Sequence, residues 1–122
     1  MPLSTHPQNI LVIRSGALGD FILTTPVLLS LRSAFPDTVL TVAGHPDRIA
    51  LLSDVVDHAL DFDAADWAPL FSDKPDTSRL TKRIAAMDLI VSFLPDSDGV
   101  FTSNLRQICS GTVTSHSPHP PN

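Results

Sequence analysis

The residues best suited to chemistry lie in a short turn after the first apolar run of the chain. The turn follows Arg14 and consists of Ser15, Gly16, Ala17, Leu18, Gly19 and Asp20. Its two glycines let the backbone bend sharply and approach a ligand closely. The amide groups that open a following helix attract an anion or a developing negative charge. We therefore expect residues 14–19 to contact a ligand, with Asp20 at the mouth of the site.

Asp20 and Arg14 each have a structural alternative. A carboxylate in the first turn of a helix can cap that helix or complement its macrodipole. Arg14 leaves the apolar run beside the turn, where it could contact a phosphate or a sugar, or form a structural ion pair. The residue types alone leave both alternatives open.

The turn does not match the dinucleotide-binding fingerprint G-x-G-x-x-G. The first of its three glycines is absent, because the residues read Ser15, Gly16, Ala17, Leu18, Gly19. The acid that would hold the ribose after the second strand is absent too, since Ala43, Gly44 and His45 stand there. These departures disfavour a nicotinamide cofactor.

The elements that must position this turn alternate between strand and helix. Residues 10–13 form a β-favouring apolar run, as in a strand covered on both faces. Helical spacing follows over residues 20–35, where Pro26 must either kink the helix or occupy its first turn with Thr25 as the cap. Further strands are predicted at residues 38–43, 58–62, 89–94 and 112–114, with helical segments near 46–53, 78–87 and 101–108. The aspartates around residues 58–62 indicate a strand at the sheet edge.

This alternation predicts an α/β fold, a Rossmann-like parallel sheet with helices on both faces. The 122 residues, of which 43% are apolar, suit a single domain. We expect a flexible lead-in over residues 1–8, the Rossmann-like domain over 9–115, and a disordered, proline-rich tail over 116–122. Ligands of such sheets bind beyond the carboxyl ends of the strands, so the turns after Ile13, Ala43 and Leu94 matter most.

Composition and charge exclude several classes of protein. Eight Lys and Arg residues against 13 aspartates give a net charge of −5, which disfavours nucleic acid as a partner. The single cysteine excludes an internal disulfide. No stretch approaches the roughly 20 apolar residues of a membrane-spanning helix. The first residues lack the basic start of a secretory signal, so we expect a cytoplasmic protein.

Other residues that could do chemistry have stronger structural interpretations. Asp96 and Asp98 spell a D-x-D motif, which can hold a metal-bound nucleotide-sugar, but a turn in which Ser97 or Asp98 caps the next helix is favoured. The scattered histidines make a metal site improbable. Cys109 is expected to lie in the core, and Trp67 and Phe71 are expected to pack a loop against it. A further set of basic residues should form either a solvated face or a patch that binds anions: Arg79, Lys82 and Arg83.

Three stretches of the chain together resemble a known family. They are residues 10–20, which end in Gly19-Asp20, residues 23–28, which include Thr25-Pro26, and residues 31–36, which contain Leu31-Arg32 and Phe35-Pro36. The combination resembles the amino-terminal opening of glycosyltransferase family 9, the ADP-heptose:lipopolysaccharide heptosyltransferases. Residues 88–93 and 104–106 resemble the family more loosely.

The resemblance implies a half of a GT-B fold, in which two Rossmann-like domains close on the substrates. The amino-terminal domain of the family binds the lipid-linked saccharide acceptor and the other domain binds most of the nucleotide-sugar. The proposed general base of the family falls on Asp20, and the reaction inverts the configuration of the sugar. A carboxylate within about 3 Å of the acceptor hydroxyl can take its proton as the new bond forms.

The resemblance also implies that this chain is incomplete as an enzyme, because family members are roughly two to three times longer. We expect the acceptor-binding half alone, inactive without a donor-binding domain supplied elsewhere. Its substrates would be a nucleotide-sugar such as ADP-heptose and a lipid-linked saccharide; no cofactor or metal is implied. The expected location is the cytoplasm, with at most peripheral contact at the inner face of the inner membrane. The alternatives are a non-catalytic ligand- or partner-binding module and an unrelated nucleotide-dependent enzyme.

Overall fold

The computed structural model describes residues 7–14, 18–71, 79–94, 96 and 98–116. Its strands are β1 Asn9–Ile13, β2 Val39–Gly44, β3 His58–Asp61, β4 Leu89–Ser92 and β5 Thr112–Ser115. Its helices are α1 Leu18–Ala34, α2 Pro46–Ile49, α3 Arg79–Ala85 and α4 Val100–Ile108, with 3₁₀ turns η1 Ala50–Leu52 and η2 Ala65–Phe71. Each predicted strand is present within two residues of its expected bounds.

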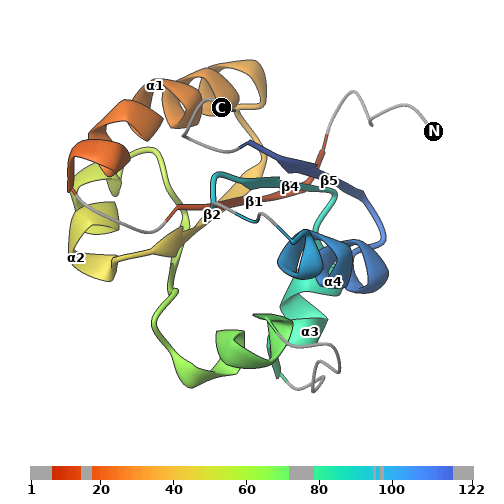
Figure 1. Ribbon diagram of the computed structural model, residues 1–122. Helices are drawn as coiled ribbons and strands as arrows, with labels where there is room; N and C mark the ends of the chain where they lie inside the picture. The colour runs from red at the N-terminus through yellow and green to blue at the C-terminus, as the bar shows by residue number, and fades with distance from the viewer. Residues whose placement is uncertain (1–6, 15–17, 72–78, 95, 97, 117–122) are drawn as a thin grey trace.

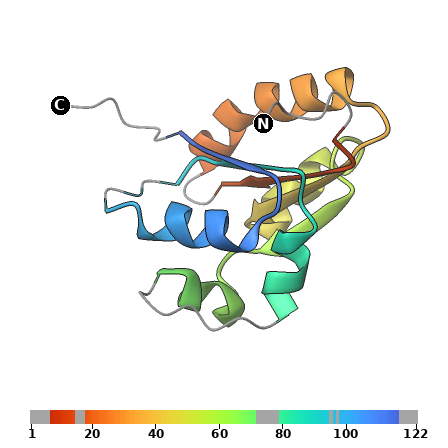
Figure 2. The same cartoon turned by 90° about the vertical axis from the view of Figure 1, so that its right-hand side faces the viewer.

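The strands form one parallel sheet in the order β3-β2-β1-β4-β5. Figure 1 shows α1 on one side of this sheet and α3 and α4 on the other, and the turned view of Figure 2 shows the same three layers. The predicted α/β, Rossmann-like fold is therefore confirmed.

The buried run of β1 divides the apolar core into two parts. Leu11 and Ile13 pack into the cluster that contains residues of η2, α3 and α4. Ile10 and Val12 pack into the cluster that contains Leu28 of α1 and residues of β2 and α2. Successive side chains of a strand point to opposite faces, so a strand covered on both sides must be apolar at every position.

The outer strand β3 has the edge position that its aspartates indicated. His58, Ala59 and Asp61 are exposed, and Leu60 is partly buried against the core. Polar residues are tolerated there because an edge strand is covered on fewer sides than a central one.

Pro26 lies inside α1, as its ninth residue, and not in the first turn. The interpretation with Thr25 as the helix cap is therefore wrong. Pro26 cannot donate a hydrogen bond to the carbonyl of Ile22, one turn earlier. Pro26 is exposed and so is 57% of Ile22, so water can reach this face of the helix and satisfy that carbonyl.

The amino edge of the sheet is tied together through Asp88, just before β4. Its carboxylate Oδ2 accepts the N–H groups of Gln8 at 2.7 Å and Asn9 at 2.9 Å. Gly111 passes so close that a Cβ there would lie 2.2 Å from the Asp88 carbonyl oxygen, which only glycine permits. Of the predicted lead-in, Gln8 is anchored in this way, while residues 1–6 lie outside the described part of the chain.

Arg32, near the end of α1, joins three segments at the same edge. Its guanidinium donates to the carbonyls of Val55, Pro36 and Thr38 and pairs with Asp57 at 2.7 Å. The N–H of Leu40 and the Arg32 guanidinium together hold the pKa of Asp57 below its usual range, against the opposing effect of burial.

We expect Arg32→Met to lower the free energy of unfolding by about 2 to 4 kcal/mol, because several partly buried carbonyls lose a charged donor. Arg32→Lys should recover only part of this loss, since an ammonium cannot reproduce the planar fork of guanidinium donors. Urea unfolding followed by circular dichroism measures both values. Full stability of the lysine variant would contradict the role of the fork.

Candidate functional site

The candidate site lies at the carboxyl edge of the sheet, between β1 and β4. The chain passes from β1 to β2 on one side and places β4 on the other side of β1. The connections that follow β1 and β4 therefore run in opposite directions, and sheets of this kind bind ligands at the point where this happens. Ile13 and Ser92 pair at this point and end the two strands.

The predicted site residues occupy the start of the β1–α1 connection. Leu18, Gly19 and Asp20 are the first three residues of α1, which begins two residues earlier than expected. The backbone of Asp20 thus belongs to the first helical turn, whose N–H groups have no partner within the helix and carry partial positive charge. Ser15, Gly16 and Ala17 lie outside the described residues, so their part in the site and that of the Asp20 side chain remain predictions.

Arg14 links the carboxyl ends of three strands. Its backbone N–H donates to the Ala43 carbonyl at 2.8 Å, and its Nη1 donates to the Phe93 carbonyl at 3.3 Å. The guanidinium carbon lies 5.8 Å from the centroid of the Phe93 ring, within cation–π range. Arg14 is only 6% exposed, so the protein holds a nearly buried positive charge at the point where the strand order reverses.

Gly44 fixes the distance between β1 and β2 beside Arg14. A Cβ at this position would lie 2.3 Å from the Arg14 carbonyl oxygen, far inside van der Waals contact. The close approach therefore requires glycine at the carboxyl end of β2.

Phe93 and His116 lie at the same edge and were not predicted as site residues. Their ring centroids are 5.9 Å apart with the planes tilted by 35°. The backbone N–H of His116 donates to the Ser92 carbonyl at 2.7 Å, which extends the pairing of β5 with β4 by one residue. The sequence analysis expected a strand over residues 89–94 and so placed Phe93 inside it. Because β4 ends at Ser92, Phe93 lies just beyond the strand end, where ligands of such sheets bind.

Asp96 and Asp98, the carboxylates of the D-x-D motif, bind the start of α4. Asp96 accepts the backbone N–H of Thr102 at 2.8 Å and the Thr102 hydroxyl at 2.6 Å, and Asp98 accepts the N–H of Val100 at 3.1 Å. Burial tends to raise the pKa of Asp96, but hydrogen bonds from the Thr102 hydroxyl and from the N–H groups of Thr102 and Phe101 outweigh it and lower that pKa. Asp98 therefore binds the first N–H of α4, as the capping interpretation expected, although the N-cap position itself is Gly99. Asp96 is a second carboxylate at this helix end, which the sequence analysis missed.

The lowered pKa of Asp96 makes its contribution to stability depend on pH. A carboxyl group with a depressed pKa in the folded state stabilises the fold above its unfolded pKa of about 3.9, and this contribution disappears as the pH falls. We expect Asp96→Asn to cost about 1 kcal/mol near neutral pH, and the difference from the unchanged protein should shrink as the pH falls below about 3.9. Chemical unfolding at several pH values measures this, and a constant difference would contradict it.

The remaining candidates mostly follow their structural interpretations. Trp67 is buried against the core, which leaves no face for stacking a substrate, and the side chain of Phe71 is outside the described ones. Cys109 is also buried, its thiol donates to the Met87 carbonyl, and burial raises the pKa of that thiol. Lys82 and Arg83 are exposed on α3.

Two classes of feature are missing from the described part of the chain. It contains no group of three or more metal-ligating side chains of the kind that could hold an ion. No helix among these residues is both long and apolar enough to cross a membrane.

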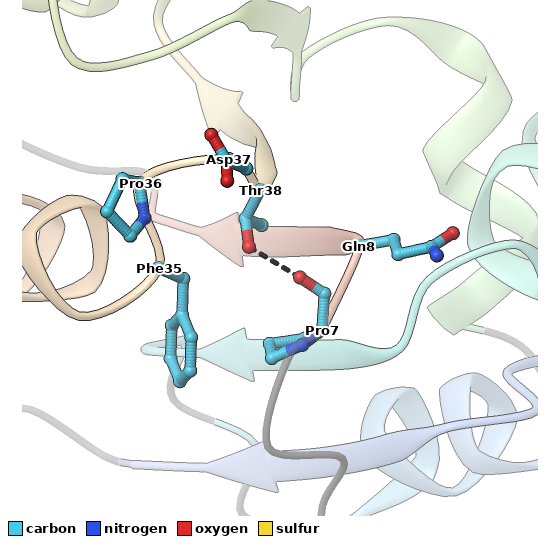
Figure 3. Close-up of a pocket in the computed structure, with 6 residues that line it drawn as sticks. All are labelled: Pro7, Gln8, Phe35, Pro36, Asp37 and Thr38. Carbon is cyan, nitrogen blue, oxygen red and sulfur yellow. Dashed lines mark hydrogen bonds between the residues drawn. The ribbon is translucent and has the colours of Figure 1, made fainter.

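A hollow at the amino edge of the sheet lies away from this site. It has a volume of about 220 Å³ and is lined by Pro7, Gln8, Phe35, Pro36, Asp37 and Thr38 (Figure 3). This is smaller than the usual 300–1,000 Å³ of a ligand pocket. Thr38, a buried polar residue in its wall, donates its hydroxyl to the Pro7 carbonyl. We therefore interpret the hollow as a packing gap between the segments that precede β1 and β2, and not as a ligand site.

Comparison with known proteins shows a likeness of fold. No family model matches the sequence, and no curated protein matches it. The fold is similar to a crystal structure of a glycosyl transferase family 9 protein from Veillonella parvula DSM 2008, with a TM-score of 0.63 and 22% sequence identity. The alignment covers 95% of this chain and 34% of that protein. The chain thus shares its fold with about one third of that protein.

Proposed function

We propose that this chain is the amino-terminal, acceptor-binding half of an inverting glycosyltransferase similar to family 9. Its reaction would move heptose or a related sugar from a nucleotide-sugar such as ADP-heptose to a lipid-linked saccharide of the lipopolysaccharide-core type. One observation carries the proposal: the fold likeness extends over 95% of this chain but over only 34% of the family 9 protein. The stretch that resembles the opening of the family supports the proposal for Asp20, which is the third residue of α1, the helix that follows β1.

In this proposal Asp20 is the general base. An acceptor hydroxyl attacks the anomeric carbon of the donor, a new C–O bond forms, and the bond to the leaving phosphate oxygen breaks. The electron pair of that bond leaves with the nucleoside diphosphate, and the hydroxyl proton passes to the Asp20 carboxylate. Attack from the face opposite the leaving group inverts the configuration.

The position of Asp20 at the start of α1 suits this role and explains why a second domain is needed. The amino terminus of α1 favours the ionised carboxylate, which can accept a proton but is a weak base. A donor-binding domain that closes over this edge of the sheet would exclude water and strengthen that base. We therefore expect little or no sugar transfer by this chain alone. The proposed location of the reaction is the cytoplasm or the inner face of the inner membrane.

The direct test is sugar transfer with and without a donor-binding domain. The chain alone and the chain fused to the donor-binding domain of a family 9 enzyme are incubated with ADP-heptose and lipopolysaccharide-core acceptors, and the product is followed by mass spectrometry. Transfer by the fusion only is the expected result. A thermal shift with NAD and none with sugar substrates would instead favour a nucleotide-dependent enzyme, since a ligand at a hundred times its Kd adds about 2.7 kcal/mol to stability.

A further inference from the structure

Three side chains from three different strand ends form a row at the carboxyl edge. Arg14 follows β1, Phe93 follows β4, and His116 follows β5. The guanidinium carbon of Arg14 lies 5.8 Å from the centroid of the Phe93 ring. The centroids of the Phe93 and His116 rings are 5.9 Å apart. We call this row the edge cluster.

Exposure increases along the edge cluster. Arg14 is nearly buried, Phe93 is partly buried, and His116 is exposed. The guanidinium and the hydrogen bond from its Nη1 to the Phe93 carbonyl hold the segment after β4 in place. The solvent-facing part of the edge cluster therefore consists of the rest of the Phe93 ring and the imidazole of His116.

Packing alone explains Phe93 only in part and His116 hardly at all. Phe93 and Phe35 are both partly buried against the same core cluster, at opposite ends of the sheet. Only Phe93 has a cation beside it and a second ring next to it among the described contacts. An exposed imidazole at the ligand-binding edge buries little apolar surface but offers a hydrogen-bonding nitrogen beside an aromatic ring.

We propose that Phe93 and His116 form the contact surface for one sugar ring of the acceptor, an inference that rests on the proposed function. A pyranose has faces of C–H bonds, which pack on an aromatic ring, and a rim of hydroxyl groups, which hydrogen bond to a neighbouring imidazole. Arg14 acts as a positioning residue, because it orients Phe93 from the buried side. Phe93 lies against Arg14, which directly follows β1, and the helix that carries Asp20 is the next element of the chain, so a sugar seated on this surface lies on the side of the sheet edge where we propose the base.

The edge cluster suits a sugar better than a nucleobase. A base needs a wide exposed aromatic face to stack on. Phe93 is only partly exposed, and Arg14 already covers part of its ring. A small ring that combines apolar faces with hydroxyl groups fits a half-exposed aromatic edge next to an imidazole.

The test uses the 122-residue chain and methyl β-D-glucopyranoside, whose equatorial hydroxyl groups leave C–H bonds on both ring faces. Saturation-transfer NMR detects which sugar protons contact the protein, and an amide chemical-shift titration gives the Kd. We expect millimolar binding, with Phe93→Leu and His116→Ala each weakening it about fivefold or more. The matched controls are Phe35→Leu, which removes a ring from the same core cluster, and His58→Ala, which removes an exposed imidazole at the amino edge; both should bind within twofold of the unchanged chain.

Each outcome decides the inference. No binding of the glycoside to the unchanged chain, equal binding by the edge-cluster variants and their controls, or binding of AMP in place of the glycoside would overturn it. In the fusion with a donor-binding domain, Phe93→Leu should raise the KM for the acceptor more than it lowers kcat. If the edge-cluster variants lose glycoside binding while turnover still depends on Asp20, the surface binds the acceptor and Asp20 acts as the base. If replacing Asp20 leaves turnover unchanged, the proposed base is refuted but the proposed surface is not.

Discussion

Replacing Asp20 by Asn in the fusion with a donor-binding domain should lower kcat by about 10² to 10⁴, the usual contribution of a general base. Asparagine keeps the shape of the side chain but cannot accept the hydroxyl proton. The KM for the acceptor should change little, because the base acts on the transition state more than on binding. Steady-state transfer assays with purified variants measure both constants.

The control for this experiment is Asp37→Asn. Asp37 is an exposed aspartate between α1 and β2, at the opposite edge of the sheet, and its replacement should leave turnover unchanged. Loss of the Asp20 charge at the start of α1 should reduce stability by no more than about 1 kcal/mol. Unchanged kcat combined with a stability loss of that size would make Asp20 a helix-terminus residue and nothing more.

Gly44→Ala should destabilise the protein by about 3 kcal/mol or more, which for a domain of this size lowers Tm by about 10 °C. The added Cβ would meet the carbonyl oxygen of Arg14 at 2.3 Å, and a backbone atom inside a sheet has little room to move. The strain falls on the hydrogen bond between the Arg14 N–H and the Ala43 carbonyl, so the candidate site should be disturbed along with the fold. Thermal unfolding followed by circular dichroism measures the loss.

Gly99→Ala is the comparison for this prediction. Gly99 has a positive φ of 74°, but a Cβ there has nothing within 4 Å. Its replacement should therefore cost only the backbone penalty of about 1 to 2 kcal/mol. Equal losses for the two variants would mean that β1 and β2 can separate to admit a methyl group.

Several elements were predictable because their signal is local. The run Ile10–Ile13 needs to be apolar at every position when helices cover both faces of a strand, and that pattern is visible in four consecutive residues. Pro26 shows the opposite case. Its local preference for the first turn of a helix was overridden, and it lies on the exposed face of α1, where water can reach the carbonyl that it leaves unpaired.

Of the three strand ends that meet in the edge cluster, the sequence analysis singled out only that of β1. Arg14 and the glycines after it stand out by residue type, whereas Phe93 was expected inside the strand over residues 89–94. His116 belonged to a segment expected to be disordered, yet its N–H continues the pairing of β5 with β4. Asp96 looked like half of a metal motif, and only its contacts with Thr102 show that it serves α4.

The sequence by itself determined the alternation of strands and helices and the buried character of β1 and β4. These properties depend on residues close together in the chain, where the period of apolar residues acts directly. Only the tertiary structure decided that β4 pairs with β1 and β5 with β4. That order brings Arg14, Phe93 and His116 to one edge, and it follows from how whole faces of helices and strands bury one another, which no short stretch of sequence encodes.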